Sequence, residues 1–208
     1  MNTKKCYVFT SFGDIETIKL ELNNDDLVIA ADGGYDKAKL LGICPNIIIG
    51  DLDSIKGNYN KDIEIIKHNI DKDDTDTFLA VKEGLKRGFK DFVVIGGLGG
   101  RLDHCLANIS LLKFIYENNS KGIIIDNKNE VRYLSNGKIE LSKNNRKSIS
   151  ILAYSNVAKG VTIKGVKYSL DNAIISNSFP IGISNSFLEE KAEISVKEGE
   201  LIIIVFNE

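Results

Sequence analysis

The sequence has few cysteines and no long charged or apolar run, and each absence argues against a class of protein. The cysteines, Cys6, Cys44 and Cys105, are odd in number, widely separated and without a CxxC pair, so neither a disulfide framework nor a structural zinc site is indicated. Apolar runs such as 47–49 are far too short to cross a bilayer. A formal net charge of −2 without a run of Lys or Arg gives no electrostatic footprint for nucleic acid or anionic lipid. We therefore expect neither nucleic acid nor a membrane as a partner.

The beginning of the chain lacks the features of a signal peptide. Residues 1–5 include two lysines, but no apolar stretch and no small-residue cleavage site follow them. We therefore expect a cytoplasmic protein. With 43% hydrophobic and 27% charged residues, the composition is that of a soluble globular chain. Its 208 residues suffice for one large domain or two modest ones, and small-molecule chemistry is the natural expectation.

The first part of the chain alternates short apolar runs with segments of helical periodicity. The runs are rich in β-branched residues and nearly continuously apolar, as in parallel strands that are buried on both faces. The pattern predicts an α/β fold, with a mostly parallel sheet and helices on both faces. The predicted strands are 6–9, 27–31, 47–49, 63–66, 92–95 and 123–125, and the predicted helices are 35–41, 75–87 and 102–118.

The pattern of apolar and polar residues changes after Asp126. From Glu130 onward there is no helical period, and short apolar runs are bounded by turn residues, as at 135–137 and 198–200. The pattern predicts a small antiparallel β domain after the α/β domain, and we place the two domains at 1–128 and 129–208. The clearest strands predicted in the second domain are 149–153, 161–164, 192–196 and 201–206.

Two aspartate-containing clusters follow predicted strands of the α/β part, where open parallel sheets bind their ligands. The first, 31–34, is Ala-Asp-Gly-Gly, which suits either a simple turn or a backbone open to close ligand approach. The second, 50–54, contains Asp51 and Asp53. If the strand continues, both side chains point to one face, and a cation would relieve their repulsion. Magnesium prefers one or two carboxylates plus phosphates, although a solvated Asp-rich turn is the alternative.

A third acidic cluster, 71–76, directly precedes a predicted helix. Asp74 there could merely cap the helix and complement its dipole. Asp73 and Asp76, three residues apart at a helix start, can share a face and could extend a metal site.

The fourth cluster, 96–104, is glycine-rich and lies between a predicted strand and a predicted helix. Its glycines, at 96, 97, 99 and 100, leave exposed amides beside a helix N-terminus, which together suit phosphate, and Arg101 adds a cation of fork geometry. Leu102 stands where the dinucleotide fingerprint needs glycine, and no GK[ST] follows as in a P-loop. His104 is more typical of a hydrogen-bonding residue at a helix start than of a general base.

Taken in order, these four clusters resemble the signature of the thiamin pyrophosphokinase family. The resemblance extends into the β part, where 159–162, 165–168 and 182–185 are similar to the thiamin-binding region of that family. It implies a Rossmann-like α/β domain that binds ATP and Mg2+. It also implies a C-terminal β-sandwich and a homodimer whose thiamin sites lie between subunits.

Carried onto this sequence, the resemblance implies specific roles. Asp51, Asp53 and Asp76 resemble the magnesium-binding carboxylates, and with Arg101 they are the candidate catalytic residues. Lys72 stands where eukaryotic members have Gln; because a lysine should avoid the thiazolium cation, we expect it to face phosphate. Tyr168 matches an aromatic residue placed against thiamin, where a ring face attracts the cation. The candidate substrate-binding residues are Asp32, Lys72, Asp73, Gly96, Gly97, Gly99, Gly100, Arg101, Asp103, Tyr168, Ile175, Ser184 and Asn185.

The implied reaction is attack of the thiamin hydroxyl on the β-phosphorus of ATP, with AMP leaving. Magnesium, Arg101 and the glycine amides would position the phosphates and neutralise their charge. Either Asp76 or Asp103 could accept the hydroxyl proton. A metal-dependent phosphohydrolase and a non-catalytic thiamin or nucleotide sensor are the alternatives.

Overall fold

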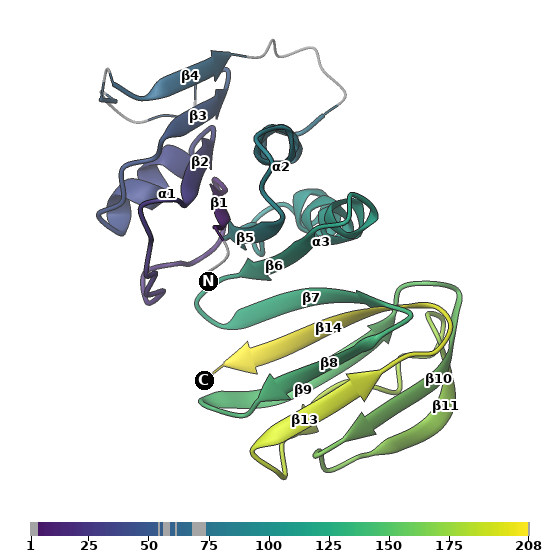
Figure 1. Cartoon of the computed structure of the whole chain (residues 1–208). Coiled ribbons are helices and arrows are strands. Elements are labelled where there is room, and N and C mark those ends of the chain that lie inside the picture. Colours follow the sequence, from purple (N-terminus) through teal and green to yellow (C-terminus); the bar gives the residue numbers. More distant parts are fainter. Residues whose placement is uncertain (1–3, 54, 56–58, 61, 68–73, 208) are drawn as a thin grey trace. The chain divides into compact units, whose positions relative to one another are not determined.

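A computed structural model describes residues 4–207 except 54, 56–58, 61 and 68–73. The chain divides into two compact units, Met1–Asn127 and Lys128–Glu208, which are coloured purple to teal and teal to yellow in Figure 1. The elements of the first unit are β1 (Cys6–Phe9), β2 (Leu27–Ala31), α1 (Gly34–Leu40), β3 (Ile47–Gly50), β4 (Glu64–Lys67), α2 (Asp76–Lys86), β5 (Asp91–Ile95), α3 (Leu102–Glu117) and β6 (Lys121–Ile125).

The strands of the first unit pair in the order β6-β5-β1-β2-β3-β4, and every pair is parallel. The chain moves outward from β1 to β4 and then returns to the other side of β1 with β5. The order therefore reverses between β1 and β5, and an open sheet of this kind binds ligands beside such a point, at the carboxyl ends of its strands.

Helices cover both faces of this sheet, as predicted. Ala38 of α1 belongs to the same buried cluster as Tyr7 and Val93 on one face. On the opposite face, a Cβ at Gly84 of α2 would come within 2.6 Å of the Phe92 ring, so the helix backbone lies directly against the strand. The strands β1, β2 and β3 are buried at every residue, which is why they read as continuous apolar runs.

The second unit contains strands only. They are β7 (Asn129–Ser135), β8 (Lys138–Ser142), β9 (Arg146–Ala153), β10 (Val157–Lys164), β11 (Leu170–Ser176), β12 (Asn185–Ser186), β13 (Lys191–Ser195) and β14 (Glu200–Asn207). The order β12-β9-β14-β7 forms one antiparallel layer and β11-β10-β13-β8 the other.

The two layers of the second unit share one hydrophobic core. Alternate residues such as Ile151 of β9 and Ile203 of β14 belong to the same buried cluster as Ile163 of β10 and Ile194 of β13. This alternation is that of a sandwich of two antiparallel sheets, so the predicted fold class is confirmed for both parts of the chain. Within the part of the chain that the structure describes, no helix is both long and apolar enough to span a bilayer.

Candidate active site

Three aspartates meet at the carboxyl ends of β2 and β3. Asp32 directly follows β2, while Asp51 and Asp53 follow β3, its parallel neighbour. One carboxylate oxygen from each residue lies within 4.8 Å of the other two. Converging carboxylates are the donor set that a hard divalent cation prefers, so these three residues fit a metal of this class.

Local backbone geometry brings Asp32 into this group. Its φ of 49° is in the left-handed region, where Asp is among the more tolerated residues, and its N–H donates to the Ile49 carbonyl at 2.7 Å. Gly50, with φ 148°, has no side chain to intervene; a Cβ there would lie 3.1 Å from the Asp32 Cβ. The end of β2 can therefore approach the end of β3 closely.

The convergence of Asp51 and Asp53 has a different cause from the one expected. Strand β3 ends at Gly50, and Leu52 has φ 72°, so the segment is a turn and the expectation of a continued strand was wrong. The N–H of Asp53 donates to Asp51 Oδ1 at 3.2 Å, as in an Asx-turn. A turn reverses the chain within a few residues, which brings the two carboxylates together as a straight strand was expected to do.

A pocket of about 170 Å³ opens at the same edge of the sheet. Asp32 lines it together with Asp74 and Asp76, which precede and begin α2. Thr75 caps this helix, since its side chain accepts from the Phe78 N–H at 3.2 Å, and Asp74 forms an ion pair with Lys82 at 2.7 Å. Asp76 therefore lies along the pocket, although it is not a member of the three-aspartate group.

The glycine-rich segment forms another wall of the pocket, but its first amides are not exposed. Gly96 and Gly97 are buried, and their N–H groups donate to the carbonyls of Ile125 at 2.8 Å and Phe12 at 2.7 Å. The expected run of exposed amides was therefore wrong for these two residues, whose absent side chains instead permit close packing. Gly99 and Gly100 are exposed, and the Gly99 N–H donates to Cys105 Sγ at 3.1 Å.

Arg101 and Asp103 form an exposed fork-shaped ion pair. The Arg101 Nε and Nη2 atoms donate to the two carboxylate oxygens of Asp103 at 3.1 and 2.5 Å. The hydrogen bond from Arg101 lowers the pKa of Asp103 to about 2, and the same bond raises the pKa of Arg101. The Arg101 guanidinium thus already has an anionic partner of the geometry that phosphate would offer.

The candidate residues of the second unit occupy different environments. Tyr168 is exposed, whereas Asn185 is buried and its side chain is bonded to Tyr168: the Tyr168 N–H donates to Asn185 Oδ1 at 2.9 Å, and Asn185 Nδ2 donates to the Tyr168 carbonyl at 2.7 Å. Ser184 is exposed, with its N–H donating to Ser150 Oγ at 2.9 Å. Ile175 lies in the hydrophobic core. The structure thus shows Asn185 bracing the backbone of Tyr168.

Some candidate residues lie outside the described part of the chain, and other pocket residues were missed. Lys72 and Asp73 are outside the described residues, as are Asp71 and Ser54 of the same clusters. The missed residues follow β1 or lie on α2 or α3; they are Thr10, Ser11, Phe12, Thr77 and Asn108. The rule that ligands bind after parallel strands would have found the first three, had it been applied to the strand at 6–9.

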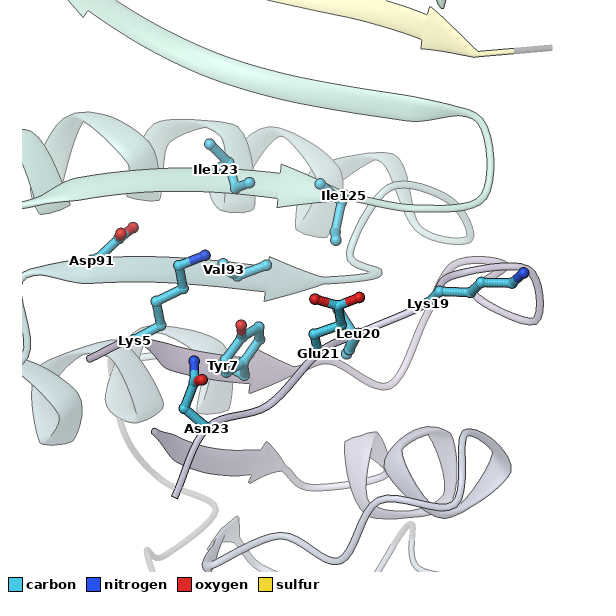
Figure 2. A pocket seen from close by; sticks show the side chains of 10 residues that line it. All are labelled: Lys5, Tyr7, Lys19, Leu20, Glu21, Asn23, Asp91, Val93, Ile123 and Ile125. Atoms are coloured by element: carbon cyan, nitrogen blue, oxygen red, sulfur yellow. The ribbon is translucent and has the colours of Figure 1, made fainter. Parts of the chain in front are cut away.

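A larger pocket, of about 650 Å³, lies on one face of the sheet rather than at its carboxyl edge. Figure 2 shows side chains of β1, β5 and β6 along one side of it and Lys19, Leu20, Glu21 and Asn23 along another. Burial raises the pKa of Tyr7 there, and the negative charges of Asp26 and Asp91 raise it further. Among the residues that the structure describes, none of the four predicted clusters lines this pocket, so the smaller pocket is the candidate active site.

Both parts of the chain are similar to known proteins. Residues 18–125 match the family model described as "Thiamin pyrophosphokinase, catalytic domain", and residues 137–201 match "Thiamin pyrophosphokinase, vitamin B1 binding domain". The chain is 32% identical over 184 residues to thiamine pyrophosphokinase of Bacillus subtilis, covering 86% of each protein, and 28% identical to thiamin pyrophosphokinase 1 of Caenorhabditis elegans, covering 80% of this chain and 76% of that protein. The crystal structure of the Bacillus subtilis protein superposes with a TM-score of 0.86 at 26% identity, over 99% of this chain and 100% of that one.

Proposed function

The chain belongs to the thiamin pyrophosphokinase family, and we propose that it transfers the pyrophosphoryl group of ATP to the hydroxyl of thiamin. The products are thiamin diphosphate and AMP. The observation that carries this function is the group of Asp32, Asp51 and Asp53 at the carboxyl edge of a parallel sheet, within the segment that matches the catalytic domain. We also propose that the two units divide the work, the first binding nucleotide and metal and the second binding thiamin.

We propose Mg2+ as the metal, because converging carboxylates leave open positions for phosphate oxygens. When bound, the ion neutralises charge on the phosphates as the pyrophosphoryl group moves. Asp32, Asp51 and Asp53 would hold it, and Asp76, at the start of α2 along the same pocket, can extend the group toward the substrate.

Asp76 is the better of the two candidates for the proton acceptor. Asp76 lines the pocket, whereas Asp103 is not among its lining residues. Arg101 instead serves the phosphates by exchanging its carboxylate partner for phosphate oxygens, which its fork of N–H groups fits equally well.

Thiamin recognition is assigned to the second unit. The exposed ring of Tyr168 can face the thiazolium cation, because an aromatic ring face attracts cations. The ring already has such a contact in the structure, since Lys167 Nζ lies 5.3 Å from its centroid. Asn185 holds the Tyr168 backbone in place through two hydrogen bonds. Ser184 remains exposed beside it in sequence and can contact the substrate.

We propose that the protein acts as a homodimer with sites between subunits. Large apolar side chains of the second unit are exposed at several positions between residues 168 and 188; besides Tyr168 they are Ile174, Phe179, Ile181, Ile183 and Leu188. Soluble monomers rarely expose so many large apolar residues within one short stretch, whereas subunit interfaces bury them. A second copy of the chain would cover this surface.

One assay separates the proposed function from its alternatives. Purified protein is incubated with Mg-ATP, with and without thiamin, and thiamin diphosphate and AMP are quantified by chromatography. The proposed enzyme forms both products in equal amounts and only when thiamin is present. A phosphohydrolase would release AMP without thiamin. A sensor would bind ligands and form neither product, so either result would contradict the proposal.

A further inference from the structure

We infer that Phe12 is the platform on which the nucleobase of the nucleotide substrate stacks. The inference rests on the proposed function, because it takes the small pocket to hold a nucleotide. Phe12 follows β1, the strand beside which the sheet order reverses, and its residue lines the same pocket as Asp32 and Asp76.

The pocket lining is chemically divided. One part is acidic, with Asp32, Asp74 and Asp76, and suits a metal bound to phosphates. Another part is aromatic, with Phe12 and His104, whose ring centroids lie 6.1 Å apart at an interplanar angle of 61°. A nucleotide has the same division, because its charge is concentrated on the phosphates while its base is flat and largely uncharged.

The backbone at Phe12 is anchored from two directions. Its carbonyl accepts from the Gly97 N–H at 2.7 Å and from Thr10 Oγ1 at 3.1 Å. The next residue, Gly13, has φ 98°, and a Cβ there would come within 3.0 Å of the Gly96 Cα, so the two loops pack backbone to backbone. A side chain on such an anchored backbone is held in place before the ligand arrives, which reduces the entropy lost on binding.

Phe12 nevertheless remains 43% exposed, although its side chain is a large apolar group. Gly100 lies close to the ring: a Cβ there would lie 3.0 Å from the ring Cδ1 atom, so a side chain at that position would crowd the ring. The absence of a side chain at Gly100 therefore leaves room beside the ring. An accessible ring with a fixed backbone can stack any base, because every base presents a π-face.

The sequence offers a direct optical test, since it contains no tryptophan. In Phe12→Trp the new side chain is the sole indole, and stacking of a base on it should quench its fluorescence. AMP and ribose 5-phosphate, which differ in the base, are titrated with Mg2+ present. We expect saturable quenching by AMP and none by ribose 5-phosphate. Equal responses to both ligands, or no response to AMP, would overturn the inference.

Kinetics of Phe12→Leu provide the second measurement. Loss of a stacking partner should raise the KM for ATP by about tenfold, within the range found for base–aromatic stacking, while the KM for thiamin changes less than about twofold. Tyr116→Leu is the matched control, because Tyr116 is a 46% exposed aromatic on α3 that does not line the pocket. Circular dichroism checks that each variant is folded.

The outcomes separate this inference from the proposed function. If Phe12→Leu keeps the wild-type KM for ATP while the wild-type protein forms thiamin diphosphate, the platform is wrong and the function stands. If the wild-type protein forms no thiamin diphosphate but AMP quenches the Phe12→Trp signal selectively, the function is wrong and the platform stands.

Discussion

Replacing Asp53 by Asn should stabilise the metal-free protein and destabilise it relative to wild type when Mg2+ is present. The carboxylate oxygens of Asp32, Asp51 and Asp53 lie within 4.8 Å of one another. Two unit charges at such a distance repel by about 1 kcal/mol in water. Asp53 takes part in two of the three pairs, and because it is exposed, salt and solvent reduce the gain from neutralising it to about 1 kcal/mol.

When metal is bound, Asp53→Asn should lower the stability of the protein instead of raising it. A ligand present at a hundred times its Kd stabilises the folded state by about 2.7 kcal/mol, and a neutral amide in place of one carboxylate should forfeit most of that gain. One kcal/mol corresponds to a change in Tm of roughly 2–4 °C for a chain of this size. We therefore expect Asp53→Asn to melt about 3 °C above wild type in EDTA and several degrees below it in saturating Mg2+, with most turnover lost.

Differential scanning fluorimetry in EDTA and in a Mg2+ series measures both signs. Asp62→Asn is the matched control: it removes an exposed aspartate from the same unit, outside the three-aspartate group, and should leave both the Tm difference and turnover unchanged. If Asp53→Asn and wild type show the same rise in Tm with Mg2+, Asp53 does not hold the metal. A variant that melts lower than wild type in EDTA would refute the repulsion argument itself.

Three further changes test other parts of the structure. Asn185→Ala should raise the KM for thiamin about tenfold and leave the KM for ATP unchanged in steady-state kinetics, because two hydrogen bonds to the Tyr168 backbone are lost. Arg101→Lys should lower kcat/KM for ATP and let the Asp103 pKa rise toward its ordinary value in an NMR titration, since one ammonium cannot reproduce the fork. Glu130→Gln should cost about 3 kcal/mol in urea unfolding at pH 7, because Arg132 and Arg146 lose their buried carboxylate partner. Burial alone would raise the Glu130 pKa, but the two arginines lower it below its ordinary value. The stabilisation by the Glu130 carboxylate is therefore present at neutral pH and is lost as the pH falls through the acidic range. At low pH the stability of Glu130→Gln should approach that of wild type.

The parts of the fold that could be predicted are those in which burial dominates the sequence pattern. The continuous apolar runs of β1, β2 and β3 are buried at every residue, so composition alone identifies them. Strand β11 was missed because most of its residues are exposed or half-buried, and a sequence such as Leu-Asp-Asn-Ala-Ile-Ile-Ser has no clear period of two. Strand order could not be predicted, because parallel pairing depends on contacts between residues far apart in the chain.

In the candidate site, too, some features could be predicted from the sequence and others could not. The positions of its clusters followed from the predicted strands, since ligands bind at the carboxyl ends of parallel strands. Which aspartates face one another did not follow, because that depends on β2 pairing with β3 in a register that sets Ala31 beside Ile49. Asp32 was therefore expected only among the substrate-binding residues, whereas the structure groups it directly with Asp51 and Asp53. The internal bonds of the Gly96 and Gly97 amides were likewise invisible, because their acceptors lie in other segments.

Strained backbone occurs within the acidic group, at Asp32 itself and at Leu52 between Asp51 and Asp53, and its placement helps to explain how the group is held. Asp32 and Leu52 are non-glycine residues with positive φ, a conformation that costs on the order of 1 kcal/mol each and persists only where surrounding contacts impose it. At Leu52 the imposing contact is packing, because its side chain lies against the buried cluster that contains Tyr35 and Ile48. Leu52 is thus held against the core, whereas Asp53, the next residue, is exposed. The strain at Leu52 thus accompanies an arrangement in which the Asp51 and Asp53 carboxylates meet outside the core, where a hydrated metal ion and phosphates can reach them.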